Sequence, residues 1–145
     1  MSRRASREFA LQFIFSFSFN QDENVIELLK EFQESETAFF DRTDYRKEDD
    51  EFAQRLVLST ISNLNEIDEV IKRCAVDWSF DRISKVDLAI LRIAINEIYF
   101  LSDIPEGVSA NEAVEISKKF SSSDSSGFIN GIIGKAIKDK HEKEI

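Results

Sequence analysis

Three arginines lie within the first seven residues of the chain, at Arg3, Arg4 and Arg7. The planar guanidinium group suits phosphate oxygens, and phosphate contacts supply most of the sequence-independent affinity of proteins for nucleic acid. The chain as a whole is acidic, with a formal net charge of −9 over 145 residues. The arginines therefore indicate an anion-binding start on an acidic body, and the alternative is a solubilising terminus that contacts nothing.

Other kinds of site chemistry lack the residues they need. The chain has one cysteine, Cys74, and one histidine, His141, so neither an internal disulfide nor a Cys/His metal site is expected. A glycine-rich phosphate loop and a nucleophile with a placed histidine are also missing from the sequence. We therefore predict a reduced intracellular protein that is not an enzyme and uses no metal or cofactor.

The arginines and the apolar stretch "FALQFIFSFSF" that follows them imitate a secretory signal. Gln12, Ser16 and Ser18 interrupt that stretch, and no small-residue cleavage site follows it. No apolar run approaches the ~20 residues that a membrane span needs. The sequence therefore predicts a cytoplasmic protein without a membrane segment.

The elements that must position the arginines are helices. Only four glycines and one proline are present, and 42% of the residues are hydrophobic. The phenylalanines near the start alternate as in a strand, but the long run without Gly or Pro favours a helix over about 3–19. The apolar periodicity predicts about seven helices in an all-α bundle: about 3–19, one that Asp22 caps and that carries Val25 to Phe32, 52–64, 67–74, 85–101, 110–120 and 127–140. The charged segment 34–50 is predicted to be an exposed connection.

Polar residues predict where three of these helices begin. Ser84 with Asp87, and Ser109 with Glu112, have the spacing of a capping box. The last helix follows the tract "SSSDSSG", in which Asp124 or Ser125 can cap it.

Two further features concern packing. We expect Trp78 to be a buried anchor, because an indole fills a large gap and can still donate its N–H. Gly127, Gly131 and Gly134 lie three or four residues apart and predict a smooth helix face. That face can pack inside the bundle or support a homodimer.

Three blocks of sequence together resemble one family. They are "RRASREFALQF", "DWSFDRISKVDLAILRIAINEI" and "SANEAVEISKKFSSSDSSGFINGII", and they span nearly the whole chain. The composite of R-E-x-A-x-Q, V-D-x-A-I-L-R-x-A-x-x-E, N-E-A-V-E and D-S-x-x-F-I-N-G is similar to the NusB family of bacterial transcription antitermination factors. The resemblance implies two packed helical subdomains, at about 1–77 and 78–145.

The resemblance also implies a function. NusB proteins bind the boxA element of nascent ribosomal RNA as a heterodimer with NusE, a small-subunit ribosomal protein, and help RNA polymerase resist termination. The acidic body would then suit a basic ribosomal protein. Two different functions stay open: a helical protein-interaction module without RNA specificity, and an accessory domain like those of certain ribosomal RNA cytosine methyltransferases.

The family motifs imply particular RNA-binding residues in this chain. At the start they are Arg3, Arg4, Arg7 and Phe15, although an aromatic on this Phe-rich helix is the kind of residue that packs in a core. In the third block the implied residues are Lys118, Lys119, Phe120, Asp124 and Phe128, and Asp124 can also cap a helix. Asp87, expected to be exposed near a helix start, matches an acidic family position near the NusE contact. Its charge would also interact favourably with the helix dipole.

Overall fold

The computed structural model describes residues 3–17, 24–34 and 47–143, and these ranges contain helices and no strand. The α-helices are α1 (Arg4–Phe17), α2 (Val25–Glu34), α3 (Asp50–Ser62), α4 (Leu64–Cys74), α5 (Lys85–Phe100), α6 (Glu106–Phe120) and α7 (Ser123–Lys143). Two short 3₁₀ helices, η1 (Lys47–Asp49) and η2 (Phe80–Arg82), precede α3 and α5. The predicted all-α fold of about seven helices is confirmed over the described residues.

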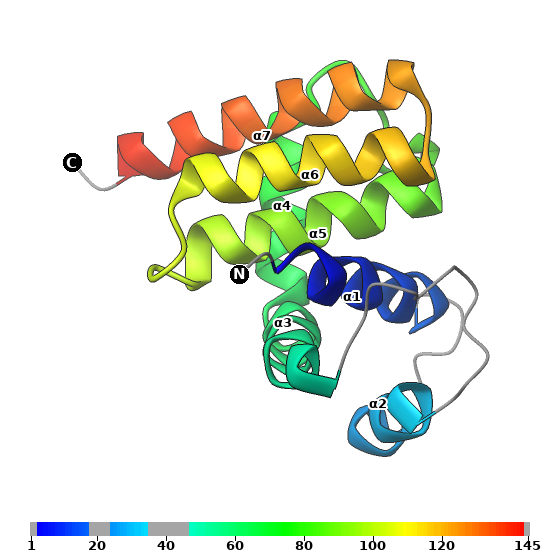
Figure 1. Ribbon diagram of the computed structural model, residues 1–145. Coiled ribbons are helices and arrows are strands. Elements are labelled where there is room, and N and C mark those ends of the chain that lie inside the picture. Colours follow the sequence, from blue (N-terminus) through cyan, green and yellow to red (C-terminus); the bar gives the residue numbers. More distant parts are fainter. Residues whose placement is uncertain (1–2, 18–23, 35–46, 144–145) are drawn as a thin grey trace.

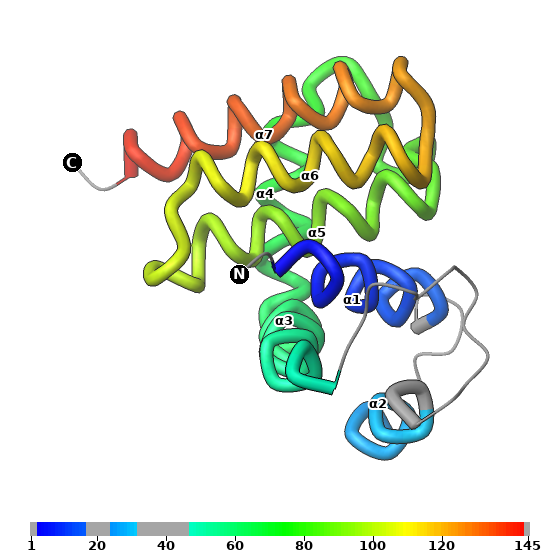
Figure 2. The backbone as a smooth tube through the Cα atoms, viewed as in Figure 1, coloured from blue at the N-terminus to red at the C-terminus, as the bar shows by residue number. Residues whose placement is uncertain are grey.

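Helix α5 lies at the centre of the bundle. It contacts α1, α3, α4, α6 and α7, and all residues from Asp87 to Ile98 are buried. Figure 1 shows α6 and α7 side by side along one flank of α5, with α1 crossing on the other flank. The tube view shows α4 behind α5 (Figure 2). Among the described helices, none is long and apolar enough to cross a membrane. The division into two subdomains stays a prediction.

The sequence predicts the beginning of α5 correctly but not the beginning of α6. Ser84 Oγ accepts a hydrogen bond from the backbone N–H of Asp87 at 3.2 Å, so the predicted cap of α5 is confirmed. The predicted cap at Ser109 is wrong, because α6 already begins at Glu106, directly after Pro105. The ring of Pro105 fixes φ at −60°, a value compatible with the start of a helix. Helix α6 therefore begins three residues before Ser109.

The caps of α2 and α7 are also different residues from those expected. Ser122 Oγ accepts from the backbone N–H of Ser125 at 3.1 Å, so neither Asp124 nor Ser125 caps α7. Several serines in a row are all able to cap a helix, and the sequence alone does not choose among them. The side chain of Asn24 accepts from the N–H of Glu27 at 3.2 Å at the start of α2. Asp22 lies outside the described residues.

Trp78 is exposed, so the prediction of a buried anchor is wrong. Its relative exposure is 56%, whereas Ala75 and Ile83 on either side are only 5% and 7% exposed. These two smaller side chains close the connection between α4 and α5 against the core. The indole is left at the surface.

The glycine face of α7 is exposed as well. A Cβ atom added to Gly127, Gly131 or Gly134 would meet nothing within 4 Å, and none of these glycines has a positive φ. The prediction that this face packs closely inside the bundle is therefore wrong. A homodimer through it stays a prediction.

We expect Gly131→Ala to stabilise the protein by about 0.5–1 kcal/mol, because alanine loses less backbone entropy in a helix interior. Chemical denaturation followed by circular dichroism measures this change. Gly134→Ala should behave alike, because its surroundings are equally open. A loss of stability in either variant would mean that the face is already covered, for example by a second copy of the chain.

Candidate nucleic-acid interface

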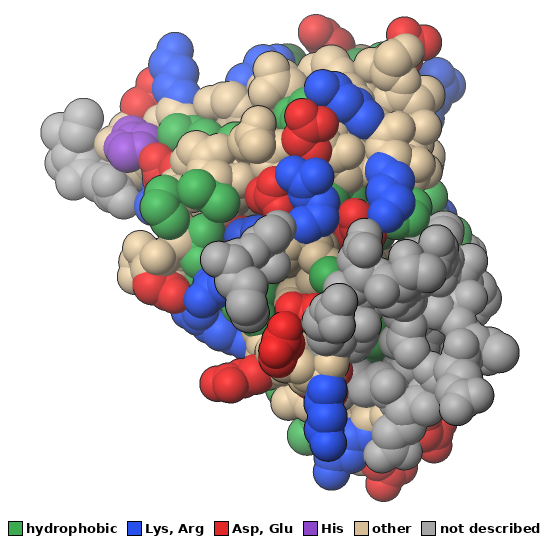
Figure 3. All heavy atoms as spheres, in the orientation of Figure 1, with side chains coloured by type: hydrophobic (Ala, Val, Ile, Leu, Met, Phe, Trp, Pro, Cys, Tyr) green, Lys and Arg blue, Asp and Glu red, His purple; other side chains and the backbone are tan. Residues whose placement is uncertain are grey.

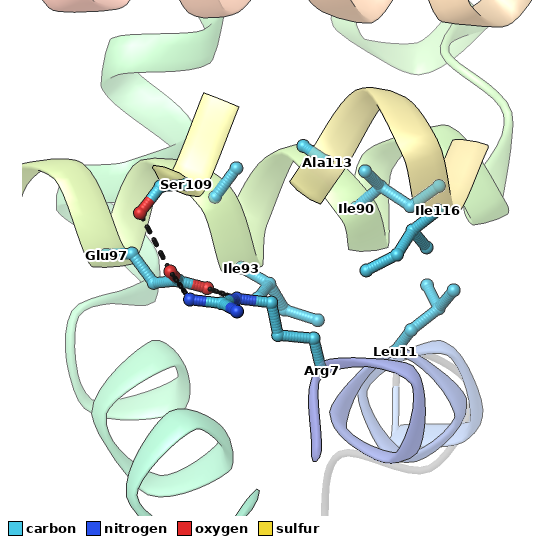
Figure 4. Close-up of a pocket in the computed structure, with 9 residues that line it drawn as sticks. Arg7, Leu11, Ile90, Ile93, Glu97, Ser109, Ala113 and Ile116 are labelled. Carbon is cyan, nitrogen blue, oxygen red and sulfur yellow. Dashed lines mark hydrogen bonds and ion pairs between the residues drawn. The ribbon is translucent and has the colours of Figure 1, made fainter. Parts of the chain in front are cut away.

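Arg7 fastens α1 to the centre of the bundle. Its Nη2 and Nε atoms lie 2.7 and 2.9 Å from the two carboxylate oxygens of Glu97 on α5, and the side chains are 4% and 1% exposed. Ser109 on α6 donates a hydrogen bond of 2.8 Å to the same carboxylate (Figure 4). The arrangement satisfies both buried charges and joins three helices at one point.

The surroundings of this ion pair are apolar. Leu11, Ile93 and Ile116 are among the residues that line a small pocket beside it (Figure 4). Charge interactions are stronger where water is excluded, and an unpaired charge is correspondingly costly there. Arg7 is therefore buried and already paired with a carboxylate, contrary to the prediction of a start whose three arginines are available to bind an anion, and its contact with RNA stays a prediction.

Arg3 and Arg4 remain closer to solvent. Arg4 makes a two-pronged ion pair with Glu112 on α6, with Nε 3.0 Å from Oε1, and 41% of its side chain is exposed. The hydrogen bond between them raises the pKa of Arg4 and lowers that of Glu112. Arg3 is exposed, and its guanidinium carbon lies 4.1 Å from the centre of the Phe52 ring, which is a cation–π contact.

The two lysines at the end of α6 also lie beside carboxylates. Lys119 Nζ is 2.9 Å from Glu8 on α1, and Lys118 Nζ is 3.6 Å from Glu115 one turn earlier. Both lysine side chains are at least half exposed. Figure 3 shows this face with basic and acidic side chains interspersed over α6. A phosphate that binds here must compete with carboxylates, so the surface favours an anion less than an unpaired basic patch would.

Asp87 is buried, so the expectation that it is exposed is wrong, and its contact with NusE stays a prediction. It is 6% exposed, and its two oxygens accept hydrogen bonds of 2.8 and 2.9 Å from the hydroxyls of Ser121 and Ser125. Ser121 lies in the turn between α6 and α7, and Ser125 lies in the first turn of α7. Asp87 therefore holds the α6–α7 junction in place beside Asp124, which is exposed in the first turn of α7.

The predicted aromatic residues are partly buried. Phe15 and Phe120 pack against the hydrophobic core, which confirms the interpretation of Phe15 as a core residue. Lys119 Nζ lies 5.2 Å from the centre of the Phe120 ring. Phe128 packs against the core and contacts Trp78 edge to face, with ring centres 5.3 Å apart. Contact of any of these residues with RNA stays a prediction.

The structure brings the arginine block and the third block together across α1 and α6. The carboxylates that join them, Glu8, Glu97 and Glu112, are the functional residues that sequence reasoning missed. A signal was available, because all three lie inside the motifs that carry the family resemblance. Within the described ranges, no group of three or more His, Cys, Asp or Glu residues could hold a metal ion.

Fold and surface together define a class: an all-α protein whose first helix is ion-paired to its central helices and presents cations beside them. A family model described as the NusB family matches residues 4–138. The chain therefore belongs to the NusB family.

Relatives and solved structures agree with this assignment. The chain is 42% identical over 140 residues to the transcription antitermination protein NusB of Natranaerobius thermophilus, covering 92% of each chain. It is 41% identical over 143 residues to the protein of the same name from Clostridium botulinum strain Hall, covering 94% of this chain and 100% of the relative. T. maritima NusB superimposes with a TM-score of 0.79 at 34% identity, over 100% and 99% of the two chains.

A further solved structure is described as antitermination factors NusB and NusE in complex with dsRNA. Its matching chain has a TM-score of 0.79 and 26% identity, covering 94% of this chain and 96% of that one.

We expect Arg7→Ala to destabilise the protein by about 3–5 kcal/mol, because it leaves the Glu97 carboxylate buried without its partner. Chemical denaturation measures the loss. Arg55→Ala is the control, since Arg55 pairs with Asp103 at the exposed surface and its loss should be much smaller. Replacing both buried partners, Arg7→Met with Glu97→Leu, should cost less than the sum of the single changes. Additive single effects would contradict a coupled buried pair.

The Arg4–Glu112 pair makes stability depend on pH. Because the hydrogen bond from Arg4 lowers the pKa of Glu112 from its ordinary 4.5, the stabilisation is complete above that value and is lost as the pH falls through the folded-state pKa. Glu112→Gln should therefore lose less stability than the parent protein between about pH 7 and about pH 3. Exposed Glu66→Gln is the control. Parallel curves for the parent and Glu112→Gln would contradict the assignment.

Proposed function

We propose that this chain is a transcription antitermination factor that binds the boxA element of nascent ribosomal RNA together with the ribosomal protein NusE. The observation that carries the proposal is its similarity, at 41–42% identity over 92–94% of the chain, to proteins named transcription antitermination protein NusB. The related complex of NusB with NusE and RNA supports both partners. The factor would act in the cytoplasm, as part of an antitermination complex with RNA polymerase.

The proposed RNA contacts divide into phosphate-binding and supporting residues. Arg3, Arg4 at the start of α1 and the two lysines at the end of α6 are the solvent-accessible cations suited to phosphate oxygens. Arg7 would act indirectly, because its buried pair with Glu97 fixes the start of α1 beside α6. Asp124 and Phe128 would approach bases from the first two turns of α7, whose start Asp87 holds through Ser121 and Ser125.

The carboxylates among the cations support a need for the second protein. Arg4, Lys118 and Lys119 each lie beside a glutamate, so their charge is already partly neutralised before RNA arrives. A basic ribosomal protein bound to the acidic body would add positive charge next to this surface. We therefore expect weak RNA binding by the chain alone and stronger binding by the heterodimer.

A helical protein-interaction module is the second candidate function, and the ion-paired state of the basic residues is the observation that favours it. Such a module would bind NusE without preferring boxA RNA. The methyltransferase accessory role has less support, because the antitermination proteins above match over 92% and 100% of their own lengths.

Fluorescence anisotropy of labelled boxA RNA and a scrambled RNA, with and without NusE, tests the proposal. We expect a preference for boxA that NusE strengthens. In the Arg3→Ala/Arg4→Ala double variant, loss of two phosphate contacts from single-stranded RNA should reduce the slope of log affinity against log salt by about 1.4.

Arg73→Ala is the matched control for Arg4. Arg73 is 42% exposed and ion-paired to Asp139 at 2.9 Å on the α4–α7 side of the bundle, so its removal should leave the salt slope unchanged. Equal affinity for boxA and scrambled RNA in the presence of NusE would reject antitermination through boxA. An unchanged salt slope in the double variant would reject only the proposed phosphate contacts of Arg3 and Arg4.

A further inference from the structure

The connection between α4 and α5 exposes two large apolar side chains that the fold does not use. Val76 is 73% exposed and Trp78 is 56% exposed, although a tryptophan in a folded chain is buried to a high degree on average. The segment passes beside the first half of α7 (Figure 1). Neither a structural role nor the RNA-binding motifs of the family resemblance account for this indole.

The indole is held in place despite its exposure. The backbone N–H of Trp78 donates to the carbonyl of Ala75 at 3.2 Å, and the ring packs edge to face on Phe128 at an interplanar angle of 66°. Buried Ala75 and Ile83 anchor the segment at both sides. A ring that is already fixed loses little conformational entropy when a second ring stacks on it.

The position of the indole connects it to the proposed RNA surface. Phe128 lies four residues, about one helical turn, after Asp124 on α7, so the two share a face of that helix. Trp78 contacts Phe128 and thus extends that face toward α4. Gly131, one turn further along, leaves open space beside it.

The size and charge of the patch favour a nucleobase over a protein. The exposed apolar part consists of Val76 and Trp78, and the same connection carries the exposed charges Asp77, Asp81 and Arg82. A stable protein interface buries about 800 Å² on each partner, with an apolar centre. One indole with charged neighbours instead matches one unpaired base, which needs an aromatic face for stacking and polar groups around its edge.

We propose that Trp78, supported by Phe128, is a stacking platform for one unpaired base of a single-stranded RNA bound along α7. The inference rests on the proposed RNA-binding function and adds a site to it. Stacking on aromatic side chains tolerates every base, so Trp78 contributes affinity and register, and the choice of sequence lies with other contacts.

The chain contains one tryptophan, so its fluorescence reports on this site alone. The experiment titrates single-stranded boxA RNA into the full chain with NusE, using the Trp78→Phe variant as the blank for emission from NusE. We expect quenching of the indole by the stacked base. The same RNA annealed to its complement should quench much less, and one abasic position should abolish the quenching.

RNA affinity by anisotropy gives the second readout. We expect Trp78→Ala to weaken binding by about five-fold or more, and Trp78→Phe to keep most of the affinity. Phe100→Ala is the control, since Phe100 is an aromatic 37% exposed at the opposite end of α5 and should have no effect. Thermal unfolding of each variant checks that it is folded.

Three results would overturn the platform. RNA binding without quenching, together with full affinity of Trp78→Ala, rejects it and leaves the antitermination proposal intact. Weaker binding of NusE to Trp78→Ala in the absence of RNA assigns the patch to a protein contact instead. Failure of the parent chain with NusE to bind boxA RNA removes the proposed function, and the platform with it.

Discussion

The buried ion pair between Arg7 and Glu97 is the interaction on which the candidate interface depends. Helix α1 begins at Arg4, and without a fixed partner the arginines of its first turn, Arg4 and Arg7, and the preceding Arg3 would have no defined position. The pair, with Ser109 as a third member, ties that turn to both α5 and α6. Because desolvated charges tolerate little displacement, the pair fixes the register of α1 as well as its contact. Arg3 and Arg4 then stand at a set distance from the lysines of α6.

The same design recurs at the other end of α6. Asp87 is buried near the start of α5, and it accepts hydrogen bonds from Ser121 in the turn before α7 and from Ser125 in the first turn of α7. Helix α5 thus supplies one carboxylate near each end, Glu97 for the start of α1 and Asp87 for the α6–α7 turn. The first turn of α1 and the α6–α7 junction are thus both held by polar contacts to α5. Buried polar anchors give them defined positions that hydrophobic packing could not supply, since packing has no direction.

Much of the fold could be predicted from the sequence, because apolar periodicity reports directly on the buried face of a helix. The apolar run predicts a helix over 85–101, and α5 occupies Lys85–Phe100. The candidate nucleic-acid interface was harder to predict from the sequence than the fold. Charge at Arg7 and Asp87 suggested exposure, whereas their partners lie 90 and 34 residues away along the chain. Periodicity carries no information about such pairs. The prediction for Trp78 was wrong because it relied on size. A large apolar side chain predicts burial, but Ala75 and Ile83 already close that part of the core.

The ion-paired state of the cations has a consequence for specificity. A surface of unpaired arginines and lysines would bind any RNA, because phosphate contacts carry no sequence information. Here each exposed cation except Arg3 among the proposed contacts lies beside a glutamate, which lowers the gain from phosphate alone. In the proposed function, RNA binding would then need additional contributions from bases and from a second protein. Under the proposed function, partial neutralisation would make the chain a poor general RNA binder, and discrimination among transcripts would depend on contacts that the correct RNA and partner supply together.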